Sequence, residues 1–208
     1  MSHSLGRTRW KLFAAIMVPG IAVATALGIG MAQGALAASF FISGRRFQLS
    51  TASLVGHGLS VYSTVDVTRE GVLVPVVVTG LRSAVIRGLC ESVVTPVPFL
   101  GPYTLRLTGA DRLRRAEARD IFIDATALNA TQQSAHDLNV GVAAGSITKG
   151  PVNPGDRHSR FFDPNGFAQQ ASTTFLANAR WQAVAVSAVT LDVPDVRVRV
   201  LAGRHECF

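Results

Sequence analysis

From about residue 45 onward, apolar and polar side chains alternate with a period of two, and this alternation restricts most of the chain to extended strands. The segment DVRVRVLAG is the clearest case. Its valines are Val196, Val198 and Val200, and the alternating arginines are Arg197 and Arg199. We therefore expect one face of this strand to be buried and the other to be basic and exposed to water.

Other runs predict further strands, some of them long. YTLRLTG (103–109) repeats the alternation, while RDIFIDATAL (119–128) and RWQAVAVSAVTLDV (180–193) have the β-branched content and the length of extended strands. VLVPVVVTG (72–80) is apolar on both faces, which is typical of a strand covered on both sides. Pro75 cannot donate to a ladder, however, and so moves this strand toward an edge or a bulge.

Helical patterns are scarce in the same region. ADRLRRAEAR (110–119) has good helix propensity but no apolar stripe, so we interpret it as a charged loop or a single turn. The longest irregular segment is KGPVNPGDRHSRFFDPNG (149–166). The sequence predicts a mainly β fold of long antiparallel strands in a curved sheet or open roll, preceded by one N-terminal hydrophobic helix.

The N-terminal residues have the layout of an export signal. Arg7, Arg9 and Lys11 form a basic region before an apolar run, and Ala35-Leu36-Ala37 followed by Ala38 is the small-x-small pattern of a cleavage site. We expect cleavage between Ala37 and Ala38. Residues 1–37 are then a signal peptide and residues 38–208 an exported β-rich domain, either secreted or associated with the cell envelope.

The length of the apolar run leaves a membrane anchor as the alternative. No charged residue occurs between Leu12 and Gly44, and about 20 apolar residues suffice to cross a bilayer as a helix. Against an anchor, the run is rich in Ala and Gly, and Pro19-Gly20 weakens a continuous helix. In both cases the basic end stays in the cytoplasm and the rest of the chain lies outside.

The charge balance argues against nucleic acid as a partner. With the three basic residues of the leader set aside, 17 basic residues stand against 13 acidic ones. No block of Lys and Arg and no interleaving of basic with aromatic residues occurs, so the mild excess is typical of a solvated surface. No phosphate-binding glycine loop or metal-ligand motif is present, and we predict neither a cofactor nor a metal site.

Two cysteines, Cys90 and Cys207, both follow the export signal. An even number of cysteines in an oxidising compartment favours a disulfide that ties the C-terminus to the middle of the fold. A reactive thiol is the alternative, since His205 and Glu206 flank Cys207.

Several segments together resemble a family of small exported actinobacterial proteins, of Streptomyces type, whose function is unknown and whose members are often labelled cholesterol esterase. The segments are RWKLFAAIMVPGIAVATALGIGMAQGALAASFFISG, GLCESVVTPVPFLGPYTLRLTG, VGVAAGSITKGP, NGFAQQA and the terminal HECF. The resemblance spans most of the chain and implies that both cysteines recur in the family, which adds to the expectation of a disulfide. It implies a secreted ester hydrolase only through the label, because no family motif can be placed on residues here.

The sequence contains no catalytic motif of the common ester hydrolases. The Gly-x-Ser-x-Gly elbow is absent, and so is the alternation of strands and helices that its fold requires. A triad of distant residues stays open, with Ser60 or Ser146 as nucleophile and one of the histidines as base. The candidate histidines are His57, His136, His158 and His205. If the protein is an enzyme, we expect a carboxylic ester hydrolase acting on lipid or sterol esters.

Aromatic side chains surround the turn in FFDPNGF. Phe161, Phe162 and Phe167 form either an apolar lip for a lipid or a turn pinned by aromatic packing onto the sheet. With the export signal and the valine-rich strands, this favours a protein that binds an apolar ligand, lipid or sterol-like, or a membrane partner such as a membrane protein. A structural protein of surface assemblies is a further alternative, and the sequence leaves the oligomeric state open.

Overall fold

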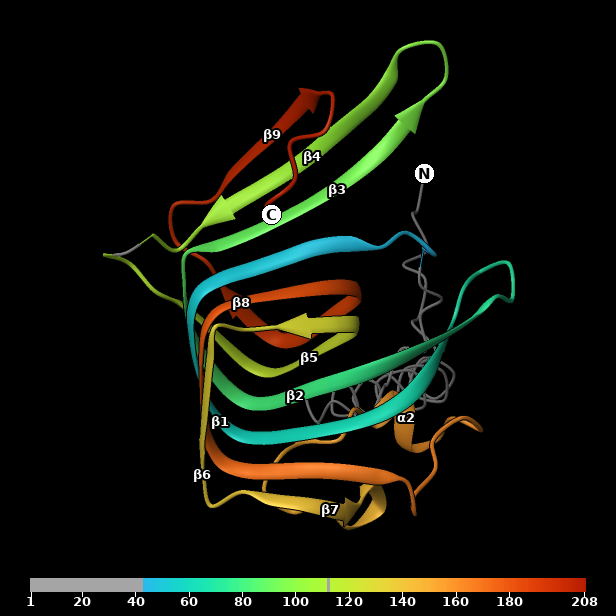
Figure 1. The fold of residues 1–208 in the computed structure, drawn as a ribbon, viewed down its shortest axis with the longest axis vertical. Coiled ribbons are helices and arrows are strands. Elements are labelled where there is room, and N and C mark those ends of the chain that lie inside the picture. The colour runs from blue at the N-terminus through green and yellow to red at the C-terminus, as the bar shows by residue number, and fades with distance from the viewer. Residues whose placement is uncertain (1–42, 112) are drawn as a thin grey trace, which may run out of the picture. The chain divides into compact units, whose positions relative to one another are not determined.

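The computed structural model describes residues 43–111 and 113–208, shown as a ribbon in Figure 1. These residues form one antiparallel sheet of nine strands, which confirms the predicted mainly β class. The expected N-terminal helix and the cleavage site at Ala37 and Ala38 lie outside the described residues. Within the described ranges, no helix is long and apolar enough to span a membrane.

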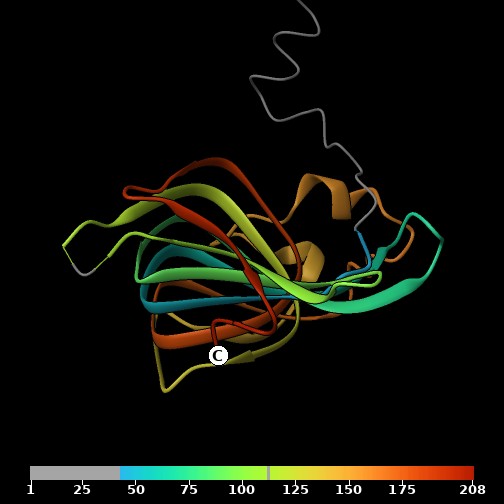
Figure 2. The ribbon, with the colours of Figure 1, turned by 90° about the horizontal axis from the view of Figure 1, so that it is seen from above.

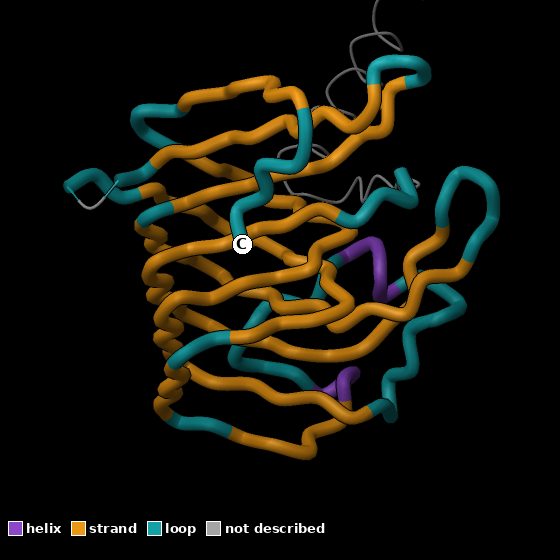
Figure 3. The backbone as a smooth tube through the Cα atoms, turned by 45° about the horizontal axis from the view of Figure 1, so that its top comes forward, coloured by secondary structure: helices purple, strands orange, loops and turns teal. Residues whose placement is uncertain are grey.

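Strands account for most of the described chain, and the helices are short, as Figure 3 shows. The strands are β1 (Phe47–Val67), β2 (Leu73–Arg87), β3 (Leu89–Val97), β4 (Gly101–Gly109), β5 (Ala116–Asn129), β6 (Gln132–His136), β7 (Asn139–Ala143), β8 (Phe167–Asp192) and β9 (Arg197–Ala202). The helices are the 3₁₀ turn η1 (Ala144–Ser146) and α2 (Pro154–Arg157). The expected charged loop at 110–119 is shorter than predicted, because β5 begins at Ala116.

Four of the strands close into a ring of pairings. β1 pairs with β2, β2 with β5, β5 with β8, and β8 pairs again with β1. β3, β4 and β9 continue the sheet from the first residues of β1, while β6 and β7 pair with the first part of β8. The expected curved sheet is therefore closed at these four strands rather than an open roll (Figures 1 and 2).

The ring closes because its long strands bend. Ala52 of β1 and Asn178 of β8 both drop out of the pairing between these strands, and Asn178 has a left-handed φ of 47°. Gly88 lies against this bend, where a Cβ would approach the Cβ of Ala52 to 2.8 Å. A second interruption of the pairing crosses all four strands, at Gly58, Arg82, Asp120 and Ser172. Each long strand thus serves more than one part of the sheet.

The sheet has a core on each face of the ring. The larger core contains the interior-facing side chains of the four strands, with Leu54, Leu81, Ile123 and Trp181 almost fully buried. The smaller core lies between the outer face and residues 144–166, which we call the covering segment. The apolar side chains in this smaller core are Tyr62, Val76, Val78, Phe122, Ala144, Ile147, Val152, Ala168, Val184 and Ala185.

Buried polar side chains fasten the covering segment to the sheet. The Oε1 atom of Gln170 accepts hydrogen bonds from the backbone N–H groups of Thr148 (2.8 Å) and Lys149 (3.0 Å). The hydroxyl of Ser60, fully buried on β1, donates to the backbone carbonyl of Pro151. These bonds satisfy the backbone of an irregular segment that packs on a sheet, where unpaired polar groups are costly.

Candidate functional site

Apolar side chains of β4 and β9 lie uncovered on one face of the sheet. Leu105 pairs with Val200, and their exposed fractions are 44% and 68%; Val198, next along β9, is 58% exposed. We call Leu105, Val198 and Val200 the apolar strip. The expectation that the valine face of this strand is buried is therefore wrong for Val198 and Val200, and also for Val196. An alternating pattern predicts that a strand has one apolar and one polar face, but it does not predict whether another element covers the apolar face. Here the core of the ring is completed by other strands, so the valine face stays uncovered.

The opposite face of the same strands is basic. Arg199 pairs with Arg106, and Arg197 pairs with Thr108, so these side chains share a face. Arg197 and Arg199 are both exposed, which agrees with the expected basic and wet face.

The C-terminal segment crosses this basic face and is bonded to it. Cys90 and Cys207 form a disulfide with a Cα–Cα distance of 6.0 Å, which confirms the expected pairing. Three side chains of the sheet also accept hydrogen bonds from backbone N–H groups of the segment. The pairs are His205 to Thr104 (2.9 Å), Cys207 to Ser92 (3.0 Å) and Phe208 to Gln48 (3.0 Å).

A carboxyl group lies beside the apolar strip, toward the larger core. In the register of the sheet, Glu91 of β3 lies between Leu49 of the core and Leu107 of β4. Leu107 in turn pairs with Val198 of β9. Cross-strand partners share a face, so Glu91 is the one charged member of an apolar row. Burial raises the pKa of Glu91 above its ordinary value.

A second polar cluster lies beneath the covering segment. The hydroxyl of Tyr62 donates to Oδ2 of Asp156 (2.7 Å) and accepts from the backbone N–H of Asn153 (3.0 Å). Tyr62 and Asp124 both lie opposite Val78 and therefore share a face. Asp124 is only 6% exposed, and its Oδ1 atom has no hydrogen-bond partner among the described residues.

Burial and mutual repulsion raise the pKa values in this cluster. Burial, followed by the charges of Asp66 and Asp156, raises the pKa of Asp124 to about 8. Burial and then Asp156 raise the pKa of Asp66 to about 6. Burial also raises the pKa of Asp156, although the hydrogen bond from Tyr62 opposes the rise. Burial, with Asp156 beside it, raises the pKa of Tyr62, so its phenol keeps its proton.

This acidic cluster serves the packing of the covering segment. Asp156 belongs to α2 and Tyr62 to β1, so their hydrogen bond joins segment to sheet. In the part of the chain that the structure describes, no three His, Cys, Asp or Glu side chains are arranged to hold a metal ion. Because the pKa of Asp124 is raised to about 8, this carboxyl is largely protonated at neutral pH. The cluster then carries less negative charge than three ionised aspartates would.

The three phenylalanines of the expected apolar lip differ in their burial and contacts. Phe162 packs into the smaller core, with its ring edge against Tyr62 at a centroid distance of 5.7 Å. Phe161 is partly buried, with the guanidinium of Arg160 over its ring at 4.7 Å, while Phe167 at the start of β8 is exposed. The packing of Phe162 corresponds to the pinned turn that the sequence left as the alternative.

The candidate serines and histidines do not come together in the described chain. Ser60 is fully buried and donates to backbone carbonyls, whereas Ser146 is exposed at the end of η1. No hydrogen bond joins a histidine to a serine in the ranges 43–111 and 113–208. The four candidate histidines, His57, His136, His158 and His205, are all exposed.

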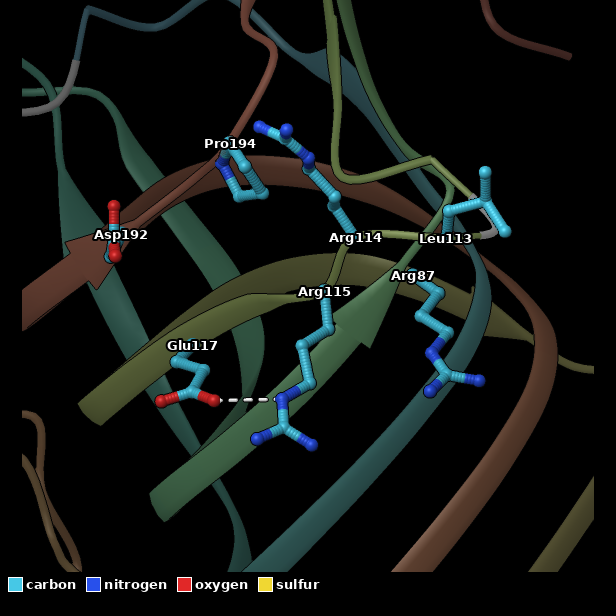
Figure 4. A pocket seen from close by; sticks show the side chains of 7 residues that line it. All are labelled: Arg87, Leu113, Arg114, Arg115, Glu117, Asp192 and Pro194. Carbon is cyan, nitrogen blue, oxygen red and sulfur yellow. Dashed lines mark hydrogen bonds and ion pairs between the residues drawn. The ribbon is translucent and has the colours of Figure 1, made fainter.

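An open pocket of about 510 Å³ lies between the loop after β4 and the end of β8, as Figure 4 shows. Its charged groups are exposed, and Arg115 pairs with Glu117 at 2.8 Å while Arg114 pairs with Asp195 at 3.5 Å. Exposed pairs of this kind contribute little, and no buried polar group points to a ligand here. The apolar strip is therefore the stronger candidate.

The fold and this surface define an antiparallel β domain with a disulfide-linked C-terminus and an uncovered apolar strip. Residues 43–208 match the model of a family of unknown function, DUF6230, and the chain belongs to this family. The description of the family names neither an activity nor a source. No curated protein and no solved structure matches the chain.

Proposed function

We propose that this chain is an exported β-rich protein of the cell envelope or exterior that binds an apolar, lipid-class ligand on the apolar strip. The observation that carries the proposal is the exposure of Leu105, Val198 and Val200 on one face, directly beside the larger core. Side chains of this kind gain roughly 1 kcal/mol each when a half-exposed surface is covered. Uncovered apolar patches beside a complete core are typical of binding sites.

The surroundings of the strip indicate the chemistry of its ligand. Leu107 continues the strip toward the core, and Glu91 is the one carboxyl in the same row. A carboxyl group hydrogen-bonds to a hydroxyl oxygen in either protonation state, accepting when ionised and donating when protonated. The ligand that fits is therefore a long apolar body with one such oxygen, as in a sterol or an acyl lipid.

Export is supported by the leader pattern and by the disulfide. The Cys90–Cys207 bond is compatible with an extracellular location, because disulfides persist in oxidising compartments. A membrane protein that covers the strip is the alternative occupant, and the experiment below separates it from a lipid.

Native mass spectrometry of the full chain from its producing cells tests the proposal. We expect a co-purifying lipid that is lost in the double variant Val198→Thr and Val200→Thr, because the hydroxyl places a polar group in the strip at nearly constant volume. The matched control is Val55→Thr with Val77→Thr, two exposed valines of β1 and β2. It should keep the lipid.

Finding no lipid on the intact protein would overturn the lipid proposal, and a co-purifying membrane protein would favour the alternative occupant. Turnover of a chromogenic acyl ester, with a serine labelled by a phosphonate probe, would instead support the ester hydrolase that the family label implies. No observation in the described residues favours that activity.

A further inference from the structure

The hairpin of β3 and β4 ends in an exposed apolar tip. From Ser92 to Leu105 the chain contains no charged residue. At the tip, Phe99 is fully exposed, with a relative exposure of 107%, and Leu100 is 68% exposed. An exposed aromatic side chain at this uncharged hairpin tip has no packing role within the domain.

The backbone at this tip would normally favour a glycine. The N–H of Leu100 donates to the carbonyl of Val97 (3.2 Å), with Pro98 and Phe99 between them. Phe99 has a φ of 68°, the left-handed conformation that turns of this kind reserve for Gly or Asn. A bulky residue is thus held in an unfavourable conformation with its side chain in solvent, a combination associated with functional sites.

The described chain begins at the same end of the sheet. The Cβ position of Gly44 lies 3.3 Å from Thr68, which closes the turn of the β1–β2 hairpin. Gln48 pairs with Ser92 in antiparallel register, so the chain before Gln48 runs in the direction of the β3–β4 tip. Figures 1 and 2 both show the tips of the β1–β2 and β3–β4 hairpins on the side where the blue start of the coloured ribbon lies.

This end also carries basic charge and further apolar surface. Arg45, Arg46 and Arg69 are exposed, and the acidic residue of the β1–β2 turn is Glu70. After that turn come two exposed apolar side chains, Val72 and Leu73. Arginine guanidinium groups bind phosphate groups, whereas exposed aromatic and aliphatic tips enter the acyl boundary of a bilayer.

We propose that this end of the domain docks on the surface of an anionic lipid bilayer, with Phe99 and Leu100 inserted and Arg45 and Arg46 on the headgroups. The position of the chain start supports the bilayer as partner. Residues 1–42 precede this end, and their uncharged run is the segment that the sequence predicts to enter a membrane. The inference rests on the proposed export but not on a ligand at the apolar strip.

Tryptophan fluorescence of the full chain on vesicles reports which end faces the bilayer. The probe is Phe99→Trp on vesicles of phosphatidylglycerol and phosphatidylcholine with brominated acyl chains. We expect blue-shifted emission and quenching by the brominated lipid. The matched control is Leu113→Trp, an exposed apolar residue in the loop at the other end of β4, which should be neither shifted nor quenched. Trp10 and Trp181 contribute equally to both variants.

The headgroup contact is tested in the same assay. Arg45→Gln with Arg46→Gln, added to Phe99→Trp, should lose most of the quenching on anionic vesicles, while Arg114→Gln with Arg115→Gln should retain it. Equal or stronger quenching at Leu113 would overturn the proposed orientation, and no quenching at Phe99 would overturn the insertion. Quenching of Phe99→Trp that is unchanged by Arg45→Gln and Arg46→Gln would overturn the headgroup contact. Each of these outcomes is independent of the lipid that native mass spectrometry detects.

Discussion

At the scale of single residues, Asp124 is the side chain whose environment differs most from that expected for its type. It lies 6% exposed on a sheet face with Tyr62, and two other aspartates, Asp66 and Asp156, contribute to its raised pKa. Nothing in the local sequence RDIFIDATAL marks this residue as different from an exposed aspartate, because its burial depends on the covering segment some 30 residues later. Its protonation is therefore a tertiary property.

The raised pKa of Asp124 predicts that stability falls as the pH rises. The unfolded carboxyl releases its proton near pH 4, whereas the folded one holds it to about pH 8, so the folded state binds more protons between these values. The free energy of unfolding should fall across this window, with a limiting slope of about 1.4 kcal/mol per pH unit. Asp66, with a pKa raised to about 6, adds to the fall between about pH 4 and 6.

Asp124→Asn should remove most of this dependence between about pH 6 and 8, because the amide cannot lose a proton. Urea unfolding at several pH values measures how the free energy of unfolding depends on pH. Asp192→Asn, at an exposed site, is the control. If the free energy of unfolding of Asp124→Asn depended on pH as strongly as that of the parent chain, Asp124 would not be the group responsible.

At the scale of elements, the covering segment differs from an ordinary loop because β1 and β8 hold it by side-chain hydrogen bonds. Ser60, Tyr62 and Gln170 each bond to it, although they come from two strands far apart in sequence. The sequence correctly predicts an irregular segment here, but its prolines and glycines do not reveal that it packs on a sheet face. The contacts arise because the ring brings β1 and β8 side by side.

Tyr62→Phe should loosen this segment and leave the ring intact. The change removes the hydrogen bonds to Asp156 and from Asn153, so we expect a loss of about 1 to 3 kcal/mol in the free energy of unfolding. Hydrogen exchange of the backbone in residues 147–158 should rise. Tyr103→Phe on β4 is the matched control, and equal effects of both changes would argue against the proposed fastening.

β9 illustrates what an alternating pattern does and does not predict. The strand and its basic face agree with the sequence, whereas the burial of its valines does not. β9 pairs with β4 at the end of the sheet, beyond the ring that encloses the larger core, and the alternation carries no information about that position.

At the scale of the whole domain, the disulfide joins the C-terminus to the middle of the chain across 117 residues. The C-terminal segment has no strand partner after Ala202, so it depends on this bond and on side chains of β1, β3 and β4. The attachment of this segment to the middle of the chain was predictable, because the sequence contains two cysteines and they were expected to pair. The strands that receive it were not predictable, because they are set by the sheet order.

Replacing both cysteines by alanine should lower the free energy of unfolding by up to about 5 kcal/mol in the chain-entropy model. Denaturant unfolding of the double variant measures the loss, and reduction of the parent chain provides a second route to the same state. We also expect faster hydrogen exchange in residues 203–208. An unchanged free energy of unfolding in both states would contradict a stabilising role for the bond.

By itself, the sequence determined the strand class, the alternating faces of individual strands and the pairing of the only two cysteines. Each of these depends on local periodicity or on counts. Only the tertiary structure decided that the sheet closes on itself, that Asp124 is buried and that the valines of β9 remain uncovered. These features depend on which distant strands become neighbours, and the burial of a side chain is set by its neighbours in space rather than in sequence.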